Sequence, residues 1–149
     1  MTERIATYDA FWTYYLSEHT DPRCRWLHLV GTSGFWVVFL AACLAAPMRM
    51  LLATTLSVAL IAACWKMEGR RSGGLVLIAV IAAAGLANPD VLWGVVWAYG
   101  FAWVGHFVLE RNRPATFTYP LWSLGSDFRM TAEMLRGRFW TGRVPHREA

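Results

Sequence analysis

Charged residues are scarce in this chain of 149 residues. They make up 16% of it while apolar residues make up 56%, and an average soluble protein has about 25% charged residues. This deficit argues against an ordinary water-soluble domain and favours a protein that is partly solvated by lipid. The length is enough for one domain and too short for two sizeable ones.

Cysteine is also scarce, and its placement is irregular. The three cysteines, Cys24, Cys43 and Cys64, lack the number and spacing of a disulfide framework or a cysteine zinc site. We interpret them as small buried apolar side chains. Residues 1–16 lack the basic start and apolar centre of a cleavable signal peptide. Internal repeats and low-complexity linkers are missing as well, so we expect a single integral membrane domain over residues 1–149.

Four apolar runs dominate the rest of the chain. They cover approximately residues 26–46, 50–66, 73–88 and 91–109. The first and last match the roughly 20 residues that a transmembrane helix needs. The two middle runs are short, so their ends must include flanking residues or the bilayer must thin around them. We therefore predict an all-α, polytopic membrane protein with four transmembrane helices.

Two amphipathic segments flank these runs. Apolar and aromatic side chains recur at helical spacing over residues 8–19, and a milder apolar face recurs over residues 127–136. Ser126 is suited to cap the start of the second segment and Gly137 to end it. We expect N- and C-terminal interfacial helices that lie on the membrane without crossing it.

The net charge of +4 comes from basic residues placed between and after the apolar runs. This placement indicates contacts with anionic lipid headgroups and not with nucleic acid. Of the 14 Lys and Arg residues, only Arg49 falls on the opposite side if both termini and the loop of residues 66–73 face the cytoplasm. The positive-inside rule therefore predicts that topology.

The predicted topology brings three of the four histidines into one layer at the cytoplasmic edge. His28 begins the first span, His106 ends the last, and His19 lies on the membrane-facing side of the first interfacial helix, whereas His146 is expected to be solvated. Glu110 follows His106 by four residues, which places both on one face of an α-helix. Histidines with a carboxylate are typical of non-haem Fe(II) sites. Interfacial polar groups, with Glu110 paired to an arginine, are the simpler interpretation of the same pattern.

Arginines surround the same layer. Arg25, Arg111 and Arg113 can each bind a carboxylate or phosphate group through two parallel hydrogen bonds. Topology and lipid contact are the simpler explanation for any one of them. Three glycines in the first and last spans are expected to let neighbouring helices approach closely: Gly31, Gly34 and Gly105.

Two motifs resemble those of a known family. One is Tyr14-Tyr-Leu-Ser-Glu-His19-Thr-Asp-Pro-Arg-Cys-Arg-Trp-Leu-His28-Leu-Val-Gly31, and the other is Gly105-His106-Phe-Val-Leu-Glu110-Arg-Asn-Arg-Pro114-Ala115. They resemble, in the same order, the signatures of the small membrane-protein family that contains the fungal 2-hydroxy fatty acid dioxygenase. The resemblance covers nearly the whole chain. It departs at Ala102, where many family members have a glutamine.

The resemblance implies an Fe(II)-dependent membrane dioxygenase of fatty-acid α-oxidation, which uses O₂ to shorten a 2-hydroxy fatty acid by one carbon. Carried over by position, His19, His28 and His106 would bind the iron, and Glu110 would be a further ligand or a base. The implied partners are the lipid substrate, O₂ and the bilayer. The arginines would meet the substrate carboxylate.

Two other functions fit the residues. A haem-binding electron-transfer protein would use His28 and His106 as axial ligands, although both are expected at the membrane edge. A non-catalytic membrane scaffold would use its histidines for structure alone. Imidazole and carboxylate ligands also accept zinc and manganese, and the residue pattern leaves the metal, the substrate chain length and the oligomeric state open.

Overall fold

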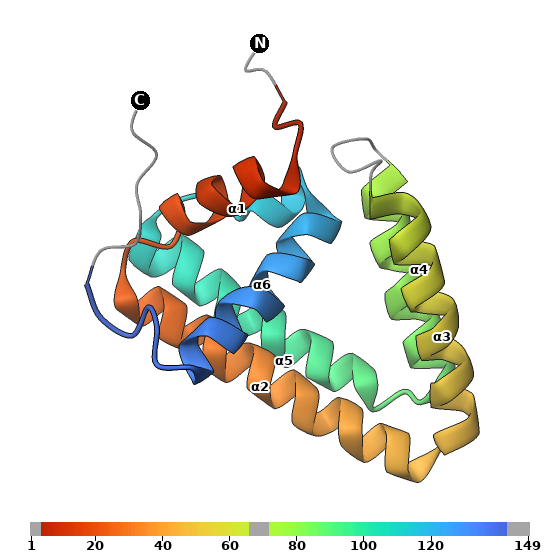
Figure 1. The fold of residues 1–149 in the computed structure, drawn as a ribbon. Coiled ribbons are helices and arrows are strands. Elements are labelled where there is room, and N and C mark those ends of the chain that lie inside the picture. Colours follow the sequence, from red (N-terminus) through yellow and green to blue (C-terminus); the bar gives the residue numbers. More distant parts are fainter. Residues whose placement is uncertain (1–3, 66–71, 143–149) are drawn as a thin grey trace.

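The computed structural model describes residues 4–65 and 72–142, and every regular element within them is a helix (Figure 1). The all-α prediction is therefore confirmed for these residues. In chain order the elements are α1 (Tyr8–Ser17), α2 (Pro22–Ala45), α3 (Pro47–Cys64), α4 (Ser72–Ala87), α5 (Val91–Val104), the π-helix η2 (Gly105–Glu110), the 3₁₀-helix η3 (Ala115–Phe117) and α6 (Pro120–Leu135).

Three helices are long and apolar enough to cross a membrane. They are α2, α3, and α5 together with η2. Helix α4 is equally apolar but has 16 residues, which at the α-helical rise is about 24 Å against a hydrocarbon core of about 30 Å. Three of the predicted spans are thus supported by length and composition, and the fourth stays a prediction.

The outer faces of these helices carry exposed apolar side chains. Leu44 and Leu86 are each 86% exposed, and Trp93 is 73% exposed. Soluble monomers rarely expose large contiguous apolar surface to water. The composition and these outer faces together indicate membrane association.

Helices α2 and α5 lie side by side along their lengths, while α3 and α4 form a second pair that diverges from the first toward one end (Figure 1). Glycines set the close approach of α2 to α5. A Cβ at Gly31 would lie 3.0 Å from the Ala98 carbonyl oxygen, and one at Gly34 would lie 2.2 Å from Trp97 Nε1. The predicted packing role of these glycines is confirmed, since no larger residue fits there without displacement.

Helices α1 and α6 cover the diverging end of the two pairs (Figure 1). They are joined by a buried core in which Phe11, Trp122 and Met130 are at most 4% exposed. The alternating directions of the helices place the start of α2 and the end of η2 at this same end, so the histidines of the two elements share one layer.

The two flanking helices differ from the prediction at their ends. Helix α1 ends at Ser17, so His19 lies in the connection to α2 and not on a helix. Helix α6 begins at Pro120, because proline is well suited to the first turn of a helix. Ser126 is therefore not an N-cap, and its buried hydroxyl donates to the Tyr8 hydroxyl at 3.3 Å. Gly137 follows α6 with a φ of 83°, as expected of a helix-ending glycine.

The topology relative to the cytoplasm stays a prediction. Residues 66–71, which supply the three basic residues of the predicted cytoplasmic loop, lie outside the described residues, and so does His146.

Candidate metal centre

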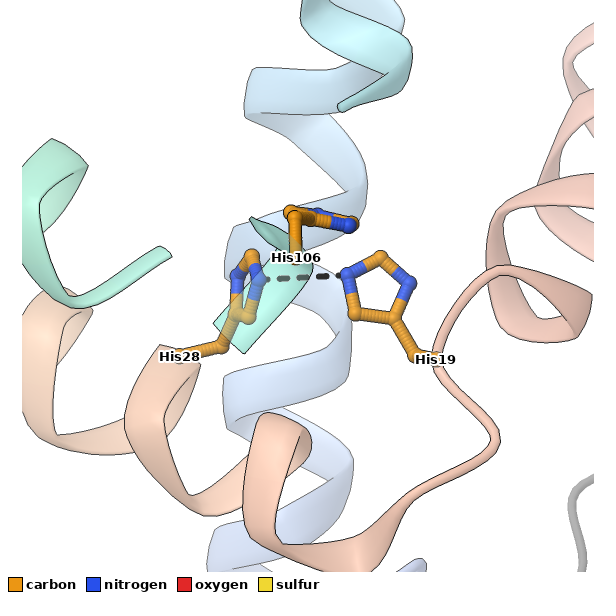
Figure 2. Close-up of side chains that lie close together, drawn as sticks. All are labelled: His19, His28 and His106. Atoms are coloured by element: carbon orange, nitrogen blue, oxygen red, sulfur yellow. Dashed lines mark hydrogen bonds between the residues drawn. The ribbon is translucent and has the colours of Figure 1, made fainter. Parts of the chain in front are cut away.

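Three histidines from three separate segments converge at the end covered by α1 and α6. His19 comes from the connection between α1 and α2, His28 from the start of α2, and His106 from η2. They are 0%, 3% and 3% exposed, and one ligand nitrogen from each lies within 4.8 Å of the others. Figure 2 shows their rings pointing toward a common centre. The structure thus brings together the three histidines that the sequence placed in one layer.

The outward-facing nitrogens of His19 and His28 are both hydrogen-bonded to acceptors. His19 Nδ1 lies 2.6 Å from the Tyr15 carbonyl oxygen, and His28 Nδ1 lies 2.7 Å from Asp127 Oδ1. The same carboxylate oxygen accepts a hydrogen bond from the Tyr15 hydroxyl. Because a carbonyl and a carboxylate can only accept, each imidazole carries its proton on Nδ1.

His106 is held in the same way by Asn112. The ring Nδ1 lies 2.7 Å from Asn112 Oδ1. The side-chain nitrogen of Asn112 donates to the carbonyl oxygen of Glu18 at 2.9 Å and to its carboxylate at 2.8 Å, which leaves the amide oxygen for the histidine. His106 therefore also donates through Nδ1.

With all three protons on Nδ1, the Nε2 atoms present lone pairs to one another. His19 Nε2 and His28 Nε2 are 3.2 Å apart (Figure 2). Two neutral rings in this tautomer have no proton to share across that gap, and a cation held between them would satisfy both lone pairs. A shell of metal–nitrogen bonds of about 2.0–2.1 Å places neighbouring ligands about 3.0–3.4 Å apart. The donor set and the spacing therefore fit a divalent metal ion.

Burial keeps His19 in its metal-binding form. Loss of solvation lowers the pKa of His19 well below its usual value, and the nearby His28 and His106 lower it further. The neutral imidazole, which is the form that binds metal ions, is therefore the stable form of His19 at neutral pH.

A π-helix positions His106. Helix α5 continues directly into η2, and the chain leaves η2 at Arg111 in a left-handed conformation with a φ of 55°. This turn folds Asn112 back, so that its backbone N–H donates to the His106 carbonyl at 3.1 Å while its side chain supports the ring. Single π-helical turns are rare and often mark functional sites.

Glu110 lies beside the centre and contacts the segment that carries His19. Its carboxylate accepts a hydrogen bond from the Thr20 hydroxyl at 2.8 Å and another from the Asp21 backbone N–H at 2.7 Å. The converging nitrogens come from the three histidines, and Glu110 fixes the connection next to one of them.

Arg25 secures the same connection from the other side. Its side chain is fully buried, and its guanidinium donates to the carbonyls of His19 at 2.7 Å and Thr20 at 2.9 Å. It also donates to the carbonyls of Phe139 and Gly142 at 2.7 and 2.9 Å. All four of these hydrogen bonds go to backbone carbonyl oxygens, so Arg25 holds backbone segments together.

Arg111 and Arg113 lie elsewhere, on the exposed surface after η2. The Arg113 guanidinium lies 5.0 Å from the centroid of the Phe117 ring. Of the three arginines predicted to meet a carboxylate, two are therefore available to an approaching ligand.

Sequence reasoning did not identify Asp127, Asn112 or Tyr15 as site residues. Asn112 lies inside the second motif, six positions after His106, and could have been noticed there. Asp127 is 99 positions from His28, and no local pattern connects residues at such a distance.

An apolar cavity of about 210 Å³ extends from the histidines between the helix pairs. His28, His106 and Asp127 line one end, and Phe39 and Val91 lie in the lining toward the other. The eleven residue steps from His28 to Phe39 along α2 correspond to about 16 Å. That is about half of a hydrocarbon core of about 30 Å, which is the depth of one lipid leaflet.

The fold and the site define a membrane-associated helical protein with a candidate metal centre at the head of an apolar cavity. The chain belongs to the family described as 2-hydroxy-palmitic acid dioxygenase Mpo1-like, whose model matches residues 5–70 and 72–139. All three histidines and both motifs fall within the matched residues. Among curated proteins and among solved structures, none matches the chain.

Proposed function

We propose that this protein is an Fe(II)-dependent membrane dioxygenase that shortens a 2-hydroxy fatty acid by one carbon in fatty-acid α-oxidation. The observation that carries the proposal is the convergence of three imidazole Nε2 lone pairs at the head of an apolar cavity. Membership of a family described by a 2-hydroxy-palmitic acid dioxygenase supports the same substrate class.

His19, His28 and His106 would hold the iron. Three protein ligands leave coordination positions open for further ligands. When bound, Fe(II) supplies the redox chemistry that activates O₂. Burial of all three imidazoles keeps bulk water away from them.

The remaining residues of the centre orient the ligands and the substrate. Asp127 and Asn112 hold the rings of His28 and His106 with the Nε2 atoms directed inward. The apolar cavity accepts the acyl tail, so that the carboxyl and 2-hydroxyl groups face the histidines. The tail binds by leaving water or lipid for a cavity of matching polarity.

We assign Glu110 and Arg25 to positioning, because both hold the connection that carries His19. Arg111 and Arg113 lie on the exposed surface next to η2, where they can attract the carboxylate of an arriving fatty acid. With the predicted topology, the centre and these arginines face the cytoplasm.

The three-histidine cluster favours a single ion over haem. Haem iron takes one or two axial ligands on opposite sides of a flat ring, whereas here three imidazoles meet at one point. Structural histidines in a scaffold would have at most one hydrogen bond between His19 Nε2 and His28 Nε2, which lie 3.2 Å apart. The convergence of a third buried imidazole on the same point favours a metal ion over a purely structural role.

The test is iron content together with turnover. We expect near-stoichiometric iron in protein purified without oxygen, and O₂-dependent conversion of 2-hydroxypalmitate to the acid one carbon shorter. The variants His28→Ala and His106→Ala should lose both. Folded wild-type protein that refuses added Fe(II) would refute the proposal, and a Soret band would indicate haem.

A further inference from the structure

Helix α6 contributes an unusual polar side chain to the apolar cavity. Ser123 lines the cavity and is 1% exposed. Within residues 4–65 and 72–142, its hydroxyl has no hydrogen-bond partner. A buried hydroxyl that lacks a partner is costly, so each such group calls for an explanation. A bound ligand that supplies the missing partner is the explanation that the position suggests.

Ser123 lies close to the candidate metal centre. It is one helical turn before Asp127 on the same face of α6, which separates the two side chains by about 5–6 Å. Asp127 in turn contacts His28 at 2.7 Å. A ligand whose head group faces the histidines therefore places its oxygens within reach of the Ser123 hydroxyl.

The three arginines predicted to meet the substrate carboxylate do not line the cavity, so they leave open which residue binds the head group there. The Arg25 guanidinium donates to four backbone carbonyls, and Arg111 and Arg113 lie on the exposed surface. Inside the cavity, a hydroxyl can donate to a carboxylate or exchange a hydrogen bond with a hydroxyl group.

We propose that Ser123 binds an oxygen of the 2-hydroxy acid head group and so holds it at the metal centre. This inference rests on the proposed substrate class, and it names a contact that neither motif contains. Ser123 is a binding residue in this account, and iron retention does not depend on it.

The experiment measures binding of 2-hydroxypalmitate and of palmitate to the iron-loaded full-length protein in nanodiscs of neutral lipid. A fluorescent fatty acid serves as the displaced probe. Ser123→Ala should weaken binding about 5- to 10-fold if the contact is to the hydroxyl group, and about 10- to 100-fold if it is to the charged carboxylate. Cysteine is similar in size to serine and is a weak donor, so the affinity of Ser123→Cys should lie between those of the wild type and Ser123→Ala. Loss for both acids assigns the contact to the carboxylate, and loss for 2-hydroxypalmitate alone assigns it to the hydroxyl.

Thr131→Val is the matched control. Thr131 is on the same helix, and its hydroxyl is also buried without a partner among the described residues, but it is outside the cavity lining. Its variant should bind both acids like the wild type. Iron content of Ser123→Ala should equal that of the wild type, and its thermal stability without substrate should not fall, because the lost hydroxyl makes no hydrogen bond to a described residue.

Unchanged affinity for both acids in Ser123→Ala would overturn the inference and leave the proposed function standing. Wild-type protein that retains iron but binds neither acid would overturn both. In turnover, the expected signature is a raised KM with kcat largely kept, and a lowered kcat at unchanged KM would contradict a binding role.

Discussion

Replacing Asp127 by asparagine tests whether the carboxylate sets the metal affinity of His28. The carboxylate accepts hydrogen bonds from His28 Nδ1 at 2.7 Å and from the Tyr15 hydroxyl. Asparagine keeps the shape and one acceptor oxygen but removes the charge that makes the imidazole a stronger ligand. If the asparagine amide rotates by about 180°, its NH₂ group faces the Nδ1 proton of His28 and disfavours the tautomer that binds a metal ion.

Loss of such a supporting contact lowers metal affinity about 10- to 100-fold, which corresponds to about 1.4–2.8 kcal/mol. We expect this loss for Asp127→Asn, measured without oxygen by competition between the protein and a chelator for Fe(II). Asp9→Asn is the control, because Asp9 is exposed on α1 and the same charge is removed away from the centre. If the Fe(II) affinity of Asp127→Asn lies within about threefold of the wild type and of Asp9→Asn, the reasoning is refuted. The contact should supply at least a tenfold gain in affinity.

Three further predictions concern the connection, the helix contact and pH. Glu110→Gln should weaken Fe(II) binding about fivefold in the same competition assay, because two charge-assisted hydrogen bonds to the connection become neutral ones. Iron binding at the wild-type level would show that Glu110 does not position His19. Gly34→Ala should lower the free energy of unfolding by about 1–3 kcal/mol in detergent, since its Cβ would lie 2.2 Å from Trp97 Nε1, whereas Gly100→Ala, with nothing within 4 Å, should be tolerated. Equal stability of the two variants would contradict the close approach. The metal-free protein should lose stability as the pH falls below about 6.5, because the pKa of His19 is lowered by folding and the unfolded chain binds the proton first. Thermal unfolding measured across pH checks this sign, and the loss should be smaller in His19→Gln.

The fold class and the histidine layer were predictable because they depend on local patterns. Runs of apolar residues identify the helices, and the alternation of their directions places His28 and His106 at one end whatever the packing details. His19 was expected on a helix, yet it lies in the connection that begins after Ser17. His19 was still predicted in the correct layer, because a residue that directly precedes a spanning helix lies at the membrane edge whether or not it is helical.

The supporting residues were not predictable for the opposite reason. Asp127 reaches His28 only because α6 crosses over α2, and that crossing depends on packing between segments about 100 residues apart. The π-helix at His106 likewise has no clear sequence signal. An α-helix through His106 and Glu110, as their spacing predicts, gave no reason to expect a contact between Asn112 and His106. The early start of α6 at Pro120 was missed because the prediction began this helix after Ser126 as its N-cap.

The buried guanidinium of Arg25 has a consequence for the order in which the protein is completed. It joins the backbone beside His19 to that of Phe139 and Gly142, so the position of a histidine made early depends on residues made late. A growing chain that has not reached these residues lacks two of the four acceptors of Arg25, so the connection that carries His19 is less firmly held. In the proposed enzyme, the third metal ligand would therefore be fixed in place only after residue 142 has been made.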